Sequence, residues 1–305
     1  VRRTMTGSGV LVLGMHRSGT SALTRALVHL GLTAGSPDDL MEPASSNRSG
    51  HWELTGLTAC NDAVLRAAGG RWSGPPAVLG PVADVDVDLR HQAEALVASL
   101  LPEQDWVWKD PRLCLTLPFW ADLLGPRPVA VVCVRNPLEV SASLAERNGF
   151  SVDYGLALWE RYLRGLWSNI AGWPAVVVHY GDTLADPPRA VDQLAGFVER
   201  HLGTVVGATA REHATSSLDD GQRHHAVEDG AGLDALSAPQ RELLDWSDAM
   251  LGTHEALPPP ELGHETPGLQ LAFDEHARMA AFEDLSLRLR AGVDQLRADL
   301  DRQTL

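Results

Sequence analysis

The sequence predicts an α/β fold in which a parallel β-sheet is flanked by helices and followed by a C-terminal helical extension. Two patterns support this prediction. Four apolar runs have the length and β-branched content of buried strands, and amphipathic stretches of helical length separate them. A chain that alternates strands and helices in this way forms a parallel sheet with helices packed against it. The expected strands are Val10–Leu13, Asp105–Lys109, Pro128–Val134 and Ala175–Tyr180.

The helices are predicted from apolar residues that recur every three or four positions. The expected helices are 18–29, 89–101, 137–146, 153–170 and 189–202. A short helix is also expected at 58–68, within a polar segment, and a loop rich in Pro and Gly follows at 69–87.

We expect one large domain over residues 1–262, with a mobile, lid-like loop at about 215–232 that carries the solvated His224 and His225. A Pro-rich linker and an amphipathic helix follow over residues 263–305. The apolar side chains of this helix recur at spacings of three and four, at Phe282, Leu285, Leu289, Val293, Leu296 and Leu300. This apolar face either forms a short coiled coil that makes a homodimer or packs back on the chain's own domain.

Composition excludes several classes of protein. The chain has 305 residues and a net charge of −15, which argues against a nucleic-acid binder because such proteins present a broad basic surface. No apolar run reaches the roughly 18 residues of a membrane span, and the N-terminus does not read as a signal peptide. The three cysteines, Cys60, Cys114 and Cys133, lack metal-ligand spacing and suit buried thiols in a reducing cytoplasm. A cytoplasmic protein without a metal site is therefore expected.

A strand, a glycine-containing turn and a helix follow one another near the N-terminus. The residues of the turn are Gly14, Met15, His16, Arg17, Ser18, Gly19, Thr20 and Ser21. Glycines let the backbone approach an anion, and the first amides of the helix point at it. The sheet is therefore of the P-loop type. However, Thr20 stands where an ATP-binding P-loop has its lysine, and the cation Arg17 precedes Gly19. Hydrolysis of a nucleoside triphosphate is therefore not expected.

A second phosphate-binding pattern follows the third expected strand. Arg135 ends the strand, Pro137 begins a helix, and Ser143 stands eight positions after Arg135. A guanidinium can bind phosphate through two parallel hydrogen bonds, and the serine hydroxyl can donate to the same phosphate. Both patterns fall at the carboxyl ends of strands, where ligands bind in α/β sheets.

Together these patterns resemble those of bacterial members of the sulfotransferase superfamily, and the resemblance extends over about 10–202. It implies binding of 3′-phosphoadenosine 5′-phosphosulfate (PAPS) without a metal, with the first pattern on the 5′-phosphosulfate and the second on the 3′-phosphate. It also implies that Tyr180, in a segment similar to the family's Tyr-Glu-Asp-Leu pattern, contacts the adenine. The residues assigned to the cofactor are His16, Arg17, Ser18, Gly19, Thr20, Ser21, Arg135, Ser143 and Tyr180.

The second expected strand ends in Lys109, the only lysine of the chain. Many cytosolic sulfotransferases have a catalytic histidine two positions after this lysine, but Pro111 stands there in this sequence. Lys109 is expected to stabilise charge on the sulfuryl group together with Arg17, or else to form a salt bridge with Asp110 at the strand end. Arg112 either pairs with an acid or touches the acceptor.

The general base must then come from another segment. The resemblance points to Asn47-Arg-Ser-Gly-His-Trp-Glu53, since several sulfotransferases take a glutamate from the corresponding region. A carboxylate in a partly dry site can accept the proton of a hydroxyl. Glu53 is the first choice, followed by His51 and then Glu42.

The residues and the resemblance together predict a PAPS-dependent O-sulfotransferase. The resemblance alone implies that the acceptor is a hydroxyl of a small-molecule natural product or a glycan. Two alternatives remain from the sequence. One is an atypical P-loop kinase. The other is a non-catalytic nucleotide-binding protein that assembles through the helix around Phe282–Leu300.

Overall fold

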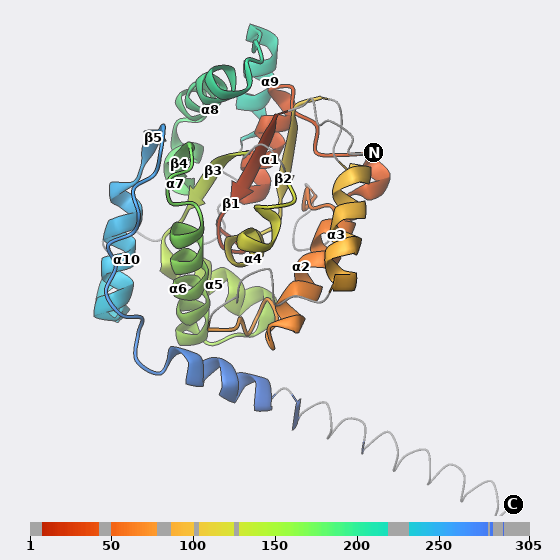
Figure 1. The fold of residues 1–305 in the computed structure, drawn as a ribbon. Coiled ribbons are helices and arrows are strands. Elements are labelled where there is room, and N and C mark those ends of the chain that lie inside the picture. The colour runs from red at the N-terminus through yellow and green to blue at the C-terminus, as the bar shows by residue number, and fades with distance from the viewer. Residues whose placement is uncertain are drawn as a thin grey trace, which may run out of the picture.

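The computed structural model describes residues 8–42, 50–77, 87–100, 104–124, 128–218, 232–279, 281–282 and 289. Its centre is a five-stranded sheet with the strand order β2-β1-β3-β4-β5 (Figure 1). The strands are β1 Gly9–Leu13, β2 Trp106–Lys109, β3 Val129–Val134, β4 Ala175–His179 and β5 Gly252–His254. The first four are parallel, as predicted, with Val12 beside Lys109 and Leu13 beside Val132.

β5 was not predicted. It pairs antiparallel with β4, and Thr253 lies beside Val176. Its three residues, Gly-Thr-His, carry no apolar run, so no strand pattern marks them. The predicted α/β fold is confirmed, and the sheet is extended by this short antiparallel edge strand.

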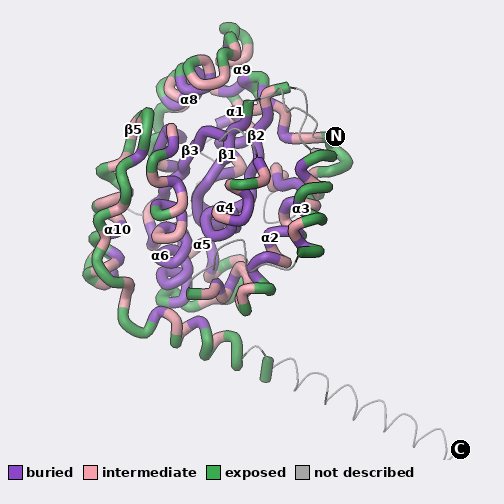
Figure 2. The backbone as a smooth tube through the Cα atoms, viewed as in Figure 1, coloured by how far each residue is buried: buried purple, intermediate pink, exposed green. Residues whose placement is uncertain are grey.

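Helices cover both faces of the sheet, so the four parallel strands are buried on both sides, whereas β5 is partly exposed (Figure 2). The side chains of the four parallel strands alternate between two apolar clusters. One cluster contains Leu11 and Val132 and packs against the helices α2 Thr55–Ala67, α3 Val87–Leu100, α4 Leu113–Trp120, α5 Pro137–Asn148, α6 Val152–Asn169 and α10 Ala238–Ala249. The other contains Val12 and Val131 and packs against α1 Thr20–His29, α7 Tyr180–Ala185, α8 Pro187–Leu202 and α9 Ala208–Ser217.

The amphipathic helices α1, α2, α3, α5, α6 and α8 were predicted, with boundaries that differ by a few residues. α4 was missed because its residues are apolar on all sides and include Pro118, so it has no helical periodicity. α7, α9 and α10 were missed as well. Residues 215–217 of the predicted lid-like loop form the end of α9, and Leu218 is buried. The rest of that loop up to residue 231, including His224 and His225, lies outside the described residues.

The segment after residue 262 lies against α6. The Thr266 amide and hydroxyl both donate to the carboxylate of Glu160, at 2.9 and 2.6 Å, and Arg161 forms an ion pair with Glu265. A helix over residues 269–279 then buries Leu269 and Phe273 in the main core. Figure 1 shows this helix leading away from the end of the α6–α10 pair.

The predicted apolar face of the C-terminal helix is described only in part. Phe282 is 72% exposed and Leu289 is 62% exposed. Leu285, Val293, Leu296 and Leu300 lie outside the described residues, so the choice between self-association and packing on the domain stays a prediction.

Candidate functional site

The turn after β1 has the backbone geometry of an anion-binding loop. Arg17 and Gly19 both have positive φ, at 70° and 96°, and Gly19 stands at the N-cap of α1 without a side-chain cap. A Cβ atom on Gly14 would lie 2.6 Å from the carbonyl oxygen of Cys133, so the turn also packs too closely against β3 for any other residue. The first amides of α1 therefore face the carboxyl edge of the sheet, where the ends of β1, β2, β3 and β4 meet.

The two predicted phosphate patterns come together at this edge, although they lie far apart in the sequence. Arg17 Nε donates to Ser143 Oγ at 2.8 Å, across 126 positions of the chain. Arg135 Nη1 donates to the backbone oxygen of Arg17 at 2.8 Å, and its Nε is held by the buried carboxylate of Glu139 at 2.8 Å. Burial and the nearby Arg135 lower the pKa of Arg17. Hydrogen bonds thus join Arg17, Arg135 and Ser143 at this edge of the sheet.

Tyr180 joins this group from the end of β4. Its ring lies under the Arg135 guanidinium, 4.9 Å from the ring centre, and is 3% exposed. A Cβ atom on Gly19 would lie 2.0 Å from Tyr180 Cδ2. Tyr180 therefore packs against both Gly19 of the turn and Arg135 after β3. Most of its ring surface is covered by other residues of the protein.

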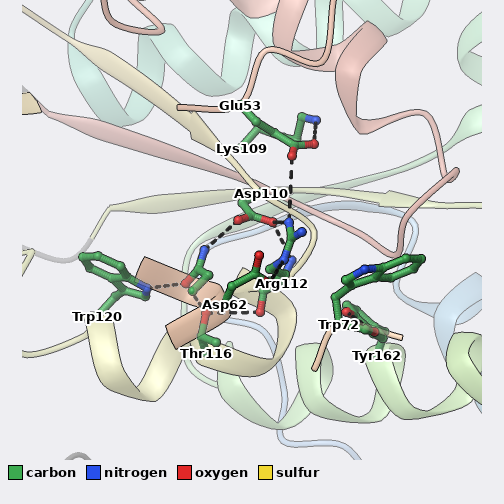
Figure 3. Close-up of polar contacts among 10 residues, drawn as sticks. Glu53, Asp62, Trp72, Lys109, Asp110, Arg112, Thr116, Trp120 and Tyr162 are labelled. Carbon is green, nitrogen blue, oxygen red and sulfur yellow. Dashed lines mark hydrogen bonds and ion pairs between the residues drawn. The ribbon is translucent and has the colours of Figure 1, made fainter. Parts of the chain in front are cut away.

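The predicted base and the lone lysine are in direct contact (Figure 3). Lys109 Nζ donates to Glu53 Oε1 at 2.5 Å, and both side chains are buried. The other oxygen of Glu53 lies 3.9 Å from Arg112 Nη1. The alternative salt bridge between Lys109 and Asp110 is not formed, because Asp110 pairs with Arg112 at 3.0 Å instead.

A buried polar network fixes Arg112 beside Glu53 (Figure 3). The fully buried Asp110 carboxylate accepts from the Arg112 amide and guanidinium and from Asn61 Nδ2, at 2.9, 3.0 and 2.9 Å. Asn61 Oδ1 in turn accepts from Thr116 and Trp120, both at 2.7 Å. Arg112 Nε donates to Asp62 at 2.7 Å. The side chains of Lys109, Glu53, Arg112 and Asp62 therefore alternate in charge. Asn61 and Asp62 do not belong to any recognisable sequence motif, so their roles could not be predicted from the sequence.

The other two candidate bases, His51 and Glu42, form no ion pair with Lys109 or Arg112 among the described residues. The Ser21 hydroxyl donates to the backbone oxygen of His51 at 3.2 Å, which joins the P-loop-type turn to the segment of Glu53. His51 is half-buried, and burial lowers its pKa. Glu42 is exposed, next to Met41, whose amide donates to the backbone oxygen of Glu53 at 2.8 Å. Residues 47–49 of the predicted base segment lie outside the described residues.

Aromatic side chains and a further arginine complete the site. His16, assigned to the cofactor from the sequence, is 8% exposed and contacts Trp72 and Tyr162, at 4.8 and 5.6 Å between ring centres. Burial, Arg112 and other cations lower its pKa well below the ordinary value, so the ring is neutral. Arg147 lies over Trp72, 5.5 Å from the ring centre. The sequence already marks Trp72, whose place in an expected loop suits stacking on a sugar or an aromatic acceptor, whereas only the fold identifies Arg147 and Tyr162.

Three solved structures resemble this chain at low sequence identity. The sulfotransferase domain of the olefin synthase from Synechococcus PCC 7002 is 17% identical, with a TM-score of 0.40, and the match covers 80% of this chain and 96% of that one. The sulfotransferase domain from the curacin biosynthetic pathway is 14% identical, with a TM-score of 0.44 and coverages of 78% and 96%. Sulfotransferase STF1 from Mycobacterium tuberculosis H37Rv is 19% identical, with a TM-score of 0.36 and coverages of 69% and 71%.

No curated protein sequence matches the chain. Within the part of the chain that the structure describes, no helix is both long enough and apolar enough to cross a membrane. A family model described as the sulfotransferase family matches residues 9–202, from the first strand to the end of α8. Because this match spans most of the sheet and the site at its carboxyl edge, the chain belongs to the sulfotransferase family.

Proposed function

We propose that the protein is a PAPS-dependent O-sulfotransferase. The observation that carries this proposal is the contact between the two phosphate patterns, in which Arg17 Nε donates to Ser143 Oγ at 2.8 Å and Arg135 binds the backbone of Arg17. A nucleotide with a phosphate on its 3′ oxygen and a phosphosulfate on its 5′ oxygen needs two anion sites close together. A nucleoside triphosphate needs only the first.

The residues present fit such a donor. The turn at 14–21 offers backbone amides and the guanidinium of Arg17 to the 5′ group, while Arg135 and Ser143 face the 3′ phosphate. Glycine is required at positions 14 and 19 by the packing of the turn itself, since a Cβ atom would collide with Cys133 at the first and with Tyr180 at the second. This local cluster of cations stands in a chain whose net charge is −15, which supports a single highly charged ligand.

When bound, the donor supplies an activated sulfuryl group. The protein then has to align the acceptor hydroxyl, take up its proton and neutralise charge. Glu53 is the proposed base. Lys109 fixes Oε1 at 2.5 Å, which leaves Oε2, 3.9 Å from Arg112, as the atom that receives the proton. Lys109 and Arg17 stabilise the charge that develops as the bond to sulfur breaks.

We place the acceptor among small-molecule natural products and glycans that carry a hydroxyl. The partly exposed ring of Trp72, which contacts His16 of the turn, supports an acceptor with a flat or ring-shaped group.

Calorimetry with adenosine 3′,5′-bisphosphate and with ATP tests the donor assignment. We expect the bisphosphate to bind and ATP to bind far more weakly. Loss of one hydrogen bond to a charged group costs about 1.5–3 kcal/mol, so Ser143→Ala and Arg135→Ala should each weaken binding of the bisphosphate by about tenfold or more.

The two variants serve different purposes. Arg135→Ala removes the ion pair with the buried Glu139 and can disturb folding, whereas Ser143→Ala removes only a hydroxyl. The matched control is Arg189→Ala, which removes an exposed guanidinium of α8. Equal binding of ATP and the bisphosphate, or unchanged affinity in both site variants, would overturn the assignment.

A further inference from the structure

Arg147 is a charged residue that the donor site does not account for. It lies on α5 one helical turn beyond Ser143, away from the helix N-terminus where Arg135 lies. Its Nε donates to the neutral side chain of Asn148 at 2.7 Å, and its guanidinium lies over the Trp72 ring. Among the described residues it forms no ion pair with a carboxylate.

The surroundings of Arg147 leave positive charge in excess. Burial lowers its pKa to about 10, and the neighbouring Arg17 and Arg112 add to this effect while Glu53 opposes it. Arg112, by contrast, is matched by Asp110 and Asp62, and Lys109 is matched by Glu53. A guanidinium that is partly removed from water without a counterion attracts an anion strongly.

Trp72, the ring under Arg147, belongs to an aromatic cluster. Trp72 contacts His16 at 4.8 Å and Phe150 at 6.0 Å between ring centres, and Tyr162 donates to the backbone oxygen of Trp72 at 2.8 Å. His16 Nε2 is buried and has no hydrogen-bond partner among the described residues. A buried polar atom without a partner costs free energy, so a ligand group at this cluster would relieve it.

We propose that Arg147 and the adjoining rings of Trp72 and His16 bind an acceptor that carries its own carboxylate beside a flat or apolar group. The inference rests on the proposed function, since it assigns the acceptor side of the same site. Arg147 binds the carboxylate, the ring of Trp72 covers the neighbouring apolar part, and His16 Nε2 hydrogen-bonds to a polar group of the same molecule. The base Glu53 then meets a hydroxyl elsewhere on the acceptor.

A binding experiment with simple probes tests this assignment without knowledge of the natural acceptor. The protein is first saturated with adenosine 3′,5′-bisphosphate and then titrated by calorimetry with benzoate or with benzamide, its neutral counterpart of similar shape. We expect benzoate to bind at least about tenfold more tightly than benzamide, as a charge-assisted hydrogen bond contributes about 1.5–3 kcal/mol. Arg147→Gln should abolish this preference, Arg147→Lys should retain part of it, and the exposed control Arg189→Gln should leave it unchanged.

The outcomes separate this inference from the donor assignment. The inference is overturned if benzoate and benzamide bind alike, if neither binds, or if Arg147→Gln keeps the preference. It is also overturned if Arg147→Gln weakens the bisphosphate as much as Ser143→Ala does, because Arg147 would then belong to the donor site. If benzoate binds through Arg147 while the bisphosphate does not bind at all, the anion site stands and the donor assignment fails.

Discussion

Lys109 Nζ and Glu53 Oε1 lie 2.5 Å apart, and the two side chains are only 2% and 9% exposed. A buried ion pair that loses one partner leaves an uncompensated charge in a poorly solvated site. We therefore expect Lys109→Met to lower the free energy of unfolding by about 3 kcal/mol, somewhat less than for an isolated pair because Arg112 also faces Glu53.

Urea denaturation measures this loss, and a double variant provides the control. Lys109→Met combined with Glu53→Gln removes both charges, so it should recover most of the lost stability. A double variant that is no more stable than Lys109→Met would show that packing, and not the ion pair, accounts for the effect.

The neutral His16 makes stability depend on pH. Its folded-state pKa lies well below 6.5, chiefly because of burial, so the unfolded chain binds a proton at this residue more readily than the folded one. Stability must then fall as the pH drops below about 6.5, by at most about 1.4 kcal/mol per pH unit from this residue. His16→Gln should reduce that slope between pH 7.5 and pH 5, as read from urea midpoints, whereas the exposed His264→Gln should not.

Position 19 requires glycine for two reasons, its positive φ and the close approach of the Tyr180 ring. Its φ is 96°, and a Cβ atom there would lie 2.0 Å from Tyr180. We expect Gly19→Ala to cost about 1–3 kcal/mol of stability and to weaken adenosine 3′,5′-bisphosphate at least about tenfold, because the turn must shift. Gly31→Ala is the matched control, with a φ of 108° but no atom within 4 Å. It should show the backbone cost alone and keep nucleotide affinity. Equal affinity in both variants would contradict the geometric argument.

Asp110 holds the network beneath Glu53. Its carboxylate is fully buried and accepts three hydrogen bonds from Asn61 and Arg112. Asp110→Asn keeps the shape but loses the charge, and should lower the unfolding free energy by about 3 kcal/mol. Asp122→Asn, at an exposed turn position, should stay within about 0.5 kcal/mol of the wild type in the same urea titration. A loss of similar size in both variants would argue against a specific role for the buried carboxylate.

The sequence predicts those parts of the fold that leave a local pattern. The four parallel strands are apolar runs buried on both sides, so they are visible in the chain itself. The strand Gly252–His254 and the helix Leu113–Trp120 have no such pattern, because one is a polar edge and the other is apolar throughout. Their positions depend on tertiary packing.

The residues of the site likewise fall into those that a sequence motif identifies and those that only the fold brings together. Arg17, Arg135 and Ser143 stand in recognisable motifs, and their contact follows once the strands are parallel. The partner of Lys109 is harder to predict, since Asp110 is adjacent in sequence but the side chains of neighbouring residues at a strand end point in different directions. Arg147 and Trp72 are 75 positions apart, and only the fold brings them together.

The burial of the lone lysine also bears on how the protein can be handled chemically. The primary amine of Lys109 is 2% exposed and held by a carboxylate, so reagents that acylate lysine side chains have no accessible target in the folded chain. Unfolding releases that amine. A single acylation at residue 109, detected by mass spectrometry, would therefore report on opening of the site. Coupling the protein to a surface through its lysine would capture unfolded molecules in preference to folded ones.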